Sequence, residues 1–368
     1  MLLRPSDWWP SQESDAVLER LSPALRRRLS AETHASAIEF QTGVHRTVAD
    51  AMGEVRELRA ALAREIGALG IRPAAAGIHP LAAAGDSTIS HGDRYQRLAS
   101  SLRALAVREP TYALHVHVGV PTASGAIRVM NRLRAHLPLL LALSANSPFW
   151  RGQDSGLASM RTPLFQAFPR TGLPRSFRSY EDYVTSIDQL IRCGGIPGPS
   201  FLWWDMRLQP GLGTLEVRIM DVQIESKDTA PLVALVQCLA RAELEEGLAP
   251  PALVDAPEIL AENRFLAARD GMAAALIDPT AGGPVPVRRL LDQTLAACED
   301  HARALGCSDE LAAAERLGQR PGASRQRILA SGPDGLQGLL VALADAFAEA
   351  PAVTHGAPRE AAGGIARP

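Results

Sequence analysis

The sequence predicts an α+β fold, with strands gathered in the first 225 residues and helices after them. Ala113–Val120 reads A-L-H-V-H-V-G-V, the strict alternation of a strand with one buried face. Thr47–Leu69 instead repeats its apolar residues every three or four positions, which is the period of an amphipathic helix. Because the two patterns are separated along the chain, they favour α+β over a doubly wound sheet.

The N-terminal third alternates predicted helices and short strands. Thr47 is a suitable N-cap for the long helix, and Gly70 is a suitable stop. The predicted elements in order are a helix over Ala16–Leu29, a strand over Thr33–Glu39, a helix over Thr47–Leu69, a strand over Ile71–Ile78 and a helix over Arg94–Arg108.

The rest of the chain holds a strand hairpin and a helix-rich second half. After the Ala113–Val120 strand we expect a helix or helix pair over Ser124–Leu143, a long polar loop over Asn146–Gly172, a helix over Tyr180–Cys193, strands over Phe201–Leu208 and Gly213–Val222 joined through Pro210-Gly211, and helices from Thr229 to about Ala348. We expect residues 1–350 to form one catalytic domain and residues 351–368 to be a disordered tail.

Composition excludes several classes of protein. The 368 residues carry a formal net charge of −2, without the basic excess of a nucleic-acid binder. The longest mostly apolar run, Leu137–Ala145, is too short to span a bilayer. We expect no signal peptide, because no N-terminal stretch has a basic start followed by an apolar run. The four cysteines form no C-x-x-C pair, so we expect free thiols in a cytoplasmic protein. With Lys227 as the only lysine, a Walker-type phosphate site is excluded.

Two histidines share one face of the Ala113–Val120 strand. His115 and His117 lie two residues apart, while Leu114, Val116 and Val118 point to the other face. Paired imidazoles can bind a metal or a phosphate or transfer protons. Two half-buried histidines without a function are an equally good interpretation of this motif alone.

Two acid–arginine pairs fall on the predicted hairpin. Glu216 and Arg218 share a face of the second strand, together with Thr214 and Met220, and Asp205 and Arg207 share a face of the first. Such pairs can be solvent-facing ion pairs of little energetic value. They can also place a carboxylate ligand for Mg²⁺ beside a guanidinium that binds phosphate or carboxylate.

Two further segments contain candidate site residues. The loop after Asn146 mixes aromatic residues, glycines and arginines, among them Arg151 and Arg161, which suits a loop over an anionic ligand as well as an ordinary surface loop. Glu39 alternates with Ile38, so it could reach a site while Ile38 enters the core. An exposed acid in a turn is the other interpretation of Glu39.

Taken together, these segments resemble the carboxylate–amine ligases of the glutamate–cysteine ligase type 2 family. The resemblance extends from about residue 15 to about residue 345, and it rests on several motifs in one order: Glu39 with Thr42-Gly43-Val44, His115 to Val120, Leu137 to Gly152, Trp204 to Arg207, Gly213 to Arg218, and Glu262-Asn263-Arg264. It implies a curved, mainly antiparallel sheet with helices packed outside, related to glutamine synthetase.

The resemblance also implies a chemistry and roles for residues. The reaction would use ATP and Mg²⁺ to join a small-molecule carboxylate, such as the γ-carboxyl of glutamate, to cysteine or another amine through an acyl phosphate. Glu39, Glu216 and His117 would hold the metal, with His115 beside the nucleotide. Arg218 would bind the transferred phosphate, and Arg151 and Arg207 a substrate carboxylate or phosphate.

One departure from the family concerns the start of the chain. Members usually begin with a strand of the type G-V-E-E-E, whose acids help to bind metal, whereas this sequence begins Met1-Leu2-Leu3-Arg4-Pro5. One hypothesis is a misassigned start codon, and the other is a true truncation that weakens or abolishes activity. Upstream DNA encoding the missing strand in frame would support the first.

Other functions stay open at this point. Without the acidic strand, the chain could be a non-catalytic homologue that binds a nucleotide or an amino acid. A hydrolase using His115 and His117 with a metal is weaker, because the sequence offers no convergent Asp/His set for two metals. The aliphatic C-terminal helices could pack on the sheet or on a second subunit of a homodimer.

Overall fold

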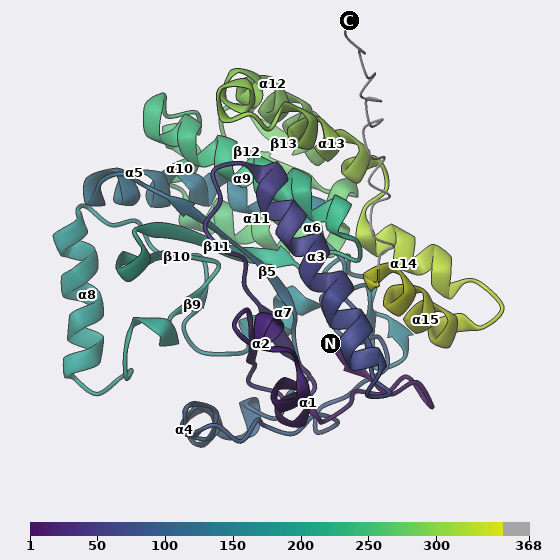
Figure 1. The fold of residues 1–368 in the computed structure, drawn as a ribbon. Helices are drawn as coiled ribbons and strands as arrows, with labels where there is room; N and C mark the ends of the chain where they lie inside the picture. Colours follow the sequence, from purple (N-terminus) through teal and green to yellow (C-terminus); the bar gives the residue numbers. More distant parts are fainter. Residues whose placement is uncertain (349–368) are drawn as a thin grey trace, which may run out of the picture.

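A three-stranded antiparallel sheet lies at the centre of the molecule (Figure 1). Its order is β10 (Met206–Gln209), β11 (Thr214–Asp221) and β5 (Ala113–Gly119), so the longest strand is in the middle. The computed structural model describes residues 1–348, and the tail predicted for residues 351–368 lies outside that range. The mixture of this sheet with surrounding helices confirms the α+β class.

One face of the sheet enters the main core. Met206, Leu208, Leu215 and Val217 are almost fully buried there, and Val116 joins them from β5. Burying a side chain of this size contributes about 1.5–3 kcal/mol relative to exposure. The alternation of each strand therefore fixes which face packs on helices and which face remains polar.

Helices cover the sheet. The first eight are α1 (Ser14–Arg20), α2 (Pro23–Arg26), α3 (Val48–Gly67), α4 (Asp93–Leu102), α5 (Ala123–Leu133), α6 (Leu137–Ser144), α7 (Arg161–Gln166) and α8 (Tyr180–Arg192). The other seven are α9 (Ser226–Glu245), α10 (Pro251–Val254), α11 (Pro257–Asp270), α12 (Val287–Leu305), α13 (Ser308–Gln319), α14 (Gly322–Ala330) and α15 (Gly335–Phe347).

Helices α6 and α9 form the inner helical layer. All eight residues of α6 are buried, as expected of a helix that is apolar all round. It contacts β11, α9 and α11, while α9 contacts β5 and also α3, α5, α12 and α13. Helices of the second half thus pack on one another within the same chain: α9 lies on β5, and α12 and α13 lie on α9.

Short strand pairs complete the sheet structure. They are β1 (Leu2–Leu3) with β4 (Arg72–Pro73), β2 (Leu29–Ala31) with β3 (Ile38–Phe40), β6 (Phe149–Trp150) with β7 (Gln153–Asp154), β12 (Ala275–Asp278) with β13 (Gly283–Pro286), and the parallel pair β8 (Thr171–Gly172) with β9 (Trp203–Trp204). Six of the seven strand pairs within residues 1–348 are antiparallel.

Several predicted elements are confirmed. The Thr47 hydroxyl accepts a hydrogen bond from the Asp50 amide and caps α3. The segment over Ser124–Leu143 is the helix pair α5 and α6, and the two strands flanking Pro210-Gly211 form the hairpin β10–β11.

Other predictions were wrong in detail. Pro23 divides the first predicted helix into α1 and α2, and only Arg72–Pro73 of Ile71–Ile78 pairs as a strand. The long loop after Asn146 contains the β6–β7 hairpin and α7, and the second half of the chain contains the unpredicted β12–β13 hairpin. Short elements of two to six residues carry too little periodicity to be recognised from sequence.

Two predictions from composition can be compared with the described residues. All four cysteines are free thiols, although the Sγ atoms of Cys238 and Cys307 lie 3.7 Å apart. Within residues 1–348, no helix has both the length and the apolar character needed to cross a bilayer.

Candidate functional site

Three charged or titratable side chains form a row across the polar face of the sheet. The register places Arg207 opposite Glu216 and Glu216 opposite His117. Directly opposite residues in antiparallel strands project from the same face. Arg207 donates from Nε to Glu216 Oε2 at 2.7 Å, and His117 Nε2 lies 3.7 Å from Glu216 Oε1. Strand pairing therefore assembles an arginine, a carboxylate and an imidazole from three strands.

Arg218 and His115 extend this row along the strands. The guanidinium of Arg218 donates to Glu216 Oε1 and lies 3.4 Å from His115 Nδ1. His115 Nδ1 in turn lies 3.6 Å from Glu216 Oε1 and 3.9 Å from Glu39 Oε1. Glu39 reaches the cluster from β3, which pairs with β2 outside the central sheet. The structure thus brings together six of the seven site residues predicted from sequence.

Glu216 is the centre of this cluster. Its side chain is only 3 % exposed, and both oxygens accept hydrogen bonds, Oε1 from Arg218 and Oε2 from Arg207 and from Gln209 at 2.7 Å. Burial opposes ionisation of this carboxyl, but the nearby positive charges, Arg218 foremost, hold the pKa of Glu216 below its usual range. Glu216 is therefore a permanent negative charge that orients two guanidinium groups.

The two other acids of the site, Glu39 and Glu32, have raised pKa values, so their ionised forms are disfavoured. Burial, together with repulsion from Glu216, raises the pKa of Glu39 despite the attraction of Arg218. Burial and then repulsion from Glu39 raise the pKa of Glu32 to about 7, although the Glu32 side chain keeps contact with solvent. Two carboxyl groups with raised pKa values mark a place where additional positive charge would be stabilising.

Both histidines favour the neutral form. Burial and the charge of Arg218 lower the pKa of His115 well below its usual value, and burial lowers the pKa of His117. The Nδ1 atom of His117 is 3.0 Å from the Thr214 hydroxyl. A neutral imidazole can bind a cation or accept a proton, so both remain usable in either role.

The donor set fits Mg²⁺ in chemistry. Glu32, Glu39 and Glu216 offer the hard carboxylate oxygens that Mg²⁺ prefers, and the raised pKa values of Glu32 and Glu39 indicate unbalanced negative charge. Among residues 1–348, however, no three acid, histidine or cysteine side chains converge as a preformed metal cage. Both oxygens of Glu216 already accept hydrogen bonds, from Arg207, Gln209 and Arg218.

Arg151 lies apart from the cluster in its contacts. It donates to the buried Glu109 at 2.8 Å and stacks over the Trp150 ring at 4.5 Å from the centroid. Its φ of 51° is followed by 81° at Gly152, so the chain turns sharply after β6. The Arg151 guanidinium is exposed and keeps the capacity to bind an anion, but its described contacts join it to neither Glu216 nor His117.

Asp205 does not form the second acid–arginine pair that the sequence suggested. Its carboxylate binds Arg264 of α11 through two hydrogen bonds of 2.5 and 3.1 Å, whereas Arg207 binds Glu216. The strand pattern breaks at Asp205, which falls between β9 and β10, so it does not share the face of Arg207.

Met220 also departs from the predicted pattern. Pairing between β11 and β5 shifts between Val217 and Met220, which places one extra residue in β11. As a result Met220 is fully buried in the core instead of facing the site with Glu216. The alternation thus holds up to Arg218 and fails beyond it.

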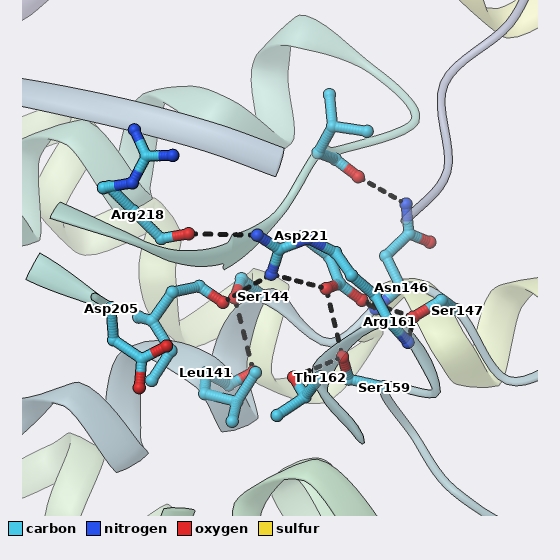
Figure 2. Close-up of polar contacts among 12 residues, drawn as sticks. Leu141, Ser144, Asn146, Ser147, Ser159, Arg161, Thr162, Asp205, Arg218 and Asp221 are labelled. Carbon is cyan, nitrogen blue, oxygen red and sulfur yellow. Dashed lines mark hydrogen bonds and ion pairs between the residues drawn. The ribbon is translucent and has the colours of Figure 1, made fainter. Parts of the chain in front are cut away.

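Sequence reasoning missed several residues that shape the site. Gln209 follows Arg207 by two positions and shares its face, so strand alternation could have identified it. Glu32 lies outside any regular pattern, and no local signal marks it. Arg161 was noted only as part of the loop after Asn146, which suited an anionic ligand as well as an ordinary surface loop. The structure instead buries it to 4 % exposure in the polar network shown in Figure 2.

Comparison with known proteins points to one family. The family model described as glutamate–cysteine ligase family 2 matches residues 3–357. A Rubrobacter xylanophilus protein with the provisional name glutamate–cysteine ligase 2-1 is 38 % identical over 81 % of this chain and 79 % of its own length. A Jannaschia protein provisionally named glutamate–cysteine ligase 2 is 37 % identical over 88 % and 85 %.

A solved structure shares the fold. Glutamate–cysteine ligase from Francisella tularensis, determined at 2.0 Å in complex with AMP, matches with a TM-score of 0.69 over 96 % of this chain and 88 % of its own. The two sequences are 13 % identical. This likeness therefore supports the shared α+β architecture, a mainly antiparallel sheet with helices outside.

Proposed function

Because the chain belongs to glutamate–cysteine ligase family 2, we propose that it is an ATP-dependent carboxylate–amine ligase. Its reaction joins the γ-carboxyl of glutamate to cysteine or another amine through an acyl phosphate. The observation that carries the proposal is the row Arg207–Glu216–His117 with Arg218 beside it. A fixed carboxylate that orients two arginines is an arrangement suited to binding transferred phosphate.

The arginines provide the electrostatic part of the mechanism. Phosphoryl transfer depends mainly on positioning and on stabilising charge on the phosphate oxygens. Arg218 is 12 % exposed and Arg207 11 %, so both guanidinium groups act where water screens them little. In our proposal Arg218 exchanges its bond to Glu216 for one to the transferred phosphate, while Arg207 keeps Glu216 in place.

The acids and histidines complete the proposed site. Glu39, Glu216 and His117 would hold Mg²⁺, which when bound would neutralise phosphate charge. Glu32 adds a fourth group to the set predicted from sequence. His115 lines the nucleotide side, and the lowered pKa of His117 keeps its imidazole neutral, which is the form that can bind a metal. Arg151 is proposed to hold a substrate carboxylate from outside the cluster.

ATP as the nucleotide is supported by the relative of known structure. The Francisella tularensis ligase was determined in complex with AMP, and the family resemblance of the sequence implies ATP as the nucleotide. We further infer that residues 1–350 act as one catalytic unit in the cytoplasm, where a reducing environment would keep Cys238 and Cys307 as thiols.

The test is ADP release by the purified chain with ATP, Mg²⁺, glutamate and a panel of amines that includes cysteine. We expect release that depends on the amine and falls by at least about 100-fold in Glu216→Gln. Glu243→Gln is the matched control, because Glu243 is also a buried acid paired with an arginine and a histidine, Arg132 and His136, in another part of the fold. Thermal unfolding of both variants excludes misfolding as the cause.

The same assay distinguishes a ligase from a non-catalytic homologue. ATP binding without turnover on any amine would contradict a ligase and favour a nucleotide-binding homologue. Amine-independent ATP hydrolysis that survives in Glu216→Gln would contradict the assignment of the site.

A further inference from the structure

A buried arginine outside the cluster holds the backbone from which Arg218 projects (Figure 2). Arg161 begins α7, and its side chain is 5 % exposed. It donates from its guanidinium to the carbonyl of Ile219 at 2.9 Å and to the carbonyl of Arg218 at 3.1 Å. Figure 2 shows the carbonyl of Arg218 facing Arg161 while the Arg218 guanidinium extends away from it.

These two carbonyls belong to the irregular part of β11. Val217 pairs with Val116, and the next pair is Met220 with Leu114, so three steps along β11 match two along β5. The extra residue lies at Arg218–Ile219, where ladder hydrogen bonds are disrupted. Buried carbonyls without ladder partners need other donors. Arg161 supplies them at both residues of the bulge.

The rest of the network fixes Arg161 itself. Asp221 is fully buried and lies 3.5 Å from the Arg161 guanidinium. The Asp221 carboxylate also accepts from the Ser147 hydroxyl at 2.7 Å, the Ser159 hydroxyl at 3.0 Å and the Asn146 amide at 2.8 Å. The loop between α6 and α7 therefore anchors the arginine that supports the bulge.

The amide of Arg218 is held on the opposite side. It donates to the carbonyl of Asp205 at 2.8 Å, and the Asp205 carboxylate is bound by Arg264. Arg218 thus has its N–H bound by one segment and its C=O by Arg161. A backbone fixed at both groups leaves little freedom in the direction of the side chain.

We propose that Arg161 is a positioning residue, which holds the β11 bulge so that Arg218 points at Glu216 and His115. This inference rests on the proposed function, in which Arg218 binds the transferred phosphate. Arg161 does not touch substrate and acts only through Arg218. A displacement of about 1 Å in a reacting group can reduce a rate about 100-fold, so loosening this bulge is expected to affect catalysis directly.

The experiment is a double-mutant cycle in the full chain. Arg161→Met is expected to lower kcat by about 10–100-fold. The KM for the amine should change by less than about twofold, because Arg161 acts through Arg218, which is proposed to bind the transferred phosphate. In an Arg218→Gln background, the same substitution should lower kcat by no more than about threefold, since its effect passes through Arg218. Arg161→Lys retains a donor and should keep more activity than Arg161→Met.

Arg134→Met is the matched control for burial of an arginine. Arg134 is 3 % exposed and also donates to two carbonyls, those of Pro174 and Val254, but it contacts no residue of the cluster. It should lower stability, though by less than Arg161→Met, which also leaves Asp221 buried without its cation. It should leave kcat near that of the unaltered chain. Equal losses of kcat from Arg161→Met with and without Arg218 would overturn the proposal.

Hydrogen exchange gives a readout that does not need activity. The Arg218 amide should exchange at least about tenfold faster in Arg161→Met than in the unaltered chain, and should not change in Arg134→Met. If the chain makes no amide at all, the proposed function fails, but this comparison still decides whether Arg161 holds the bulge. Unchanged protection of Arg218 in Arg161→Met would overturn the inference.

Discussion

The two halves of β11 are built differently. Thr214–Val217 pairs regularly with β10 on one side and β5 on the other. Arg218–Asp221 lies beyond the β10 ladder, contains the register shift and is bound by side chains from the loop between α6 and α7. The first half is held by backbone pairing, and the second by a buried polar network.

Arg218 stands at the boundary between these halves. The regular half places Glu216 in a row with Arg207 and His117, so the position of the carboxylate follows from pairing alone. The bulged half sets the direction of Arg218 through contacts that no local pattern determines. One strand thus combines a carboxylate fixed by strand pairing with an arginine whose direction is set by residues outside the strand.

Removing the buried acid of the bulged half should have the largest effect on stability. Asp221→Ala leaves the Arg161 guanidinium without its buried partner, and we expect a loss of about 3–5 kcal/mol of unfolding free energy. Thr214→Ala, at the other end of the same strand, should cost less than about 1 kcal/mol. Urea unfolding of both variants measures the difference, and similar losses would contradict the distinction between the halves.

A smaller loss of stability is expected at Gly77, where the backbone lies close to Asp221. A Cβ at Gly77 would lie 2.7 Å from Asp221 Oδ2 and 2.8 Å from Ser147 Oγ. Because both groups are held by hydrogen bonds, Gly77→Ala should destabilise by about 1–3 kcal/mol. Gly53→Ala is the control, since a Cβ there meets nothing within 4 Å inside α3 and should stabilise by about 0.5–1 kcal/mol. If Gly77→Ala leaves the free energy of unfolding unchanged, the hydrogen-bond network around Asp221 can move to make room.

In the regular half, loss of one donor to Glu216 should have a modest effect on activity. Gln209→Ala removes the 2.7 Å hydrogen bond to Glu216 Oε2, while Arg207 still binds the same oxygen. We expect kcat/KM to fall by about 2–10-fold, the equivalent of one hydrogen bond. Gln189→Ala on the exposed side of α8 should have no effect. A loss as large as that of Glu216→Gln would instead give Gln209 a direct role in the reaction.

The smallest expected effect is on how thermal stability depends on pH. The pKa of Glu32 is raised from 4.5 to about 7, so its contribution to folded stability is complete below pH 4.5 and is lost as the pH rises from 4.5 to about 7. Glu32→Gln removes this loss and should raise Tm relative to the unaltered chain at pH 8, with little difference at pH 5. Glu57→Gln, at an exposed acid of α3, is the control. Parallel curves of Tm against pH for the unaltered chain and Glu32→Gln would contradict this.

Strand alternation predicted a large part of the site. It placed His115 with His117 and Glu216 with Arg218, and the Pro210-Gly211 turn predicted the hairpin that joins Arg207 to Glu216. These relations depend on residues close in sequence or on a period of two. They are therefore visible in the chain before any fold is known.

The remainder could not be predicted, for physical reasons. An extra residue in β11 moves Met220 to the core, and a bulge has no reliable signature when neither residue is glycine. The partner of Asp205 is Arg264, which lies 59 residues away on another element. The burial of Arg161 depends on Asp221 and two serines brought together only by the folded chain.

Transfer of ¹⁸O from glutamate to phosphate tests the central claim most directly. The labelled γ-carboxyl attacks the terminal phosphorus of ATP and releases ADP. The amine then attacks the acyl carbon of the acyl phosphate and displaces inorganic phosphate, which carries one former carboxyl oxygen. We predict one ¹⁸O atom in inorganic phosphate for each amide bond that the purified chain forms. Amide formation that releases unlabelled phosphate would contradict the acyl phosphate, and absence of both amide and labelled phosphate would contradict a ligase.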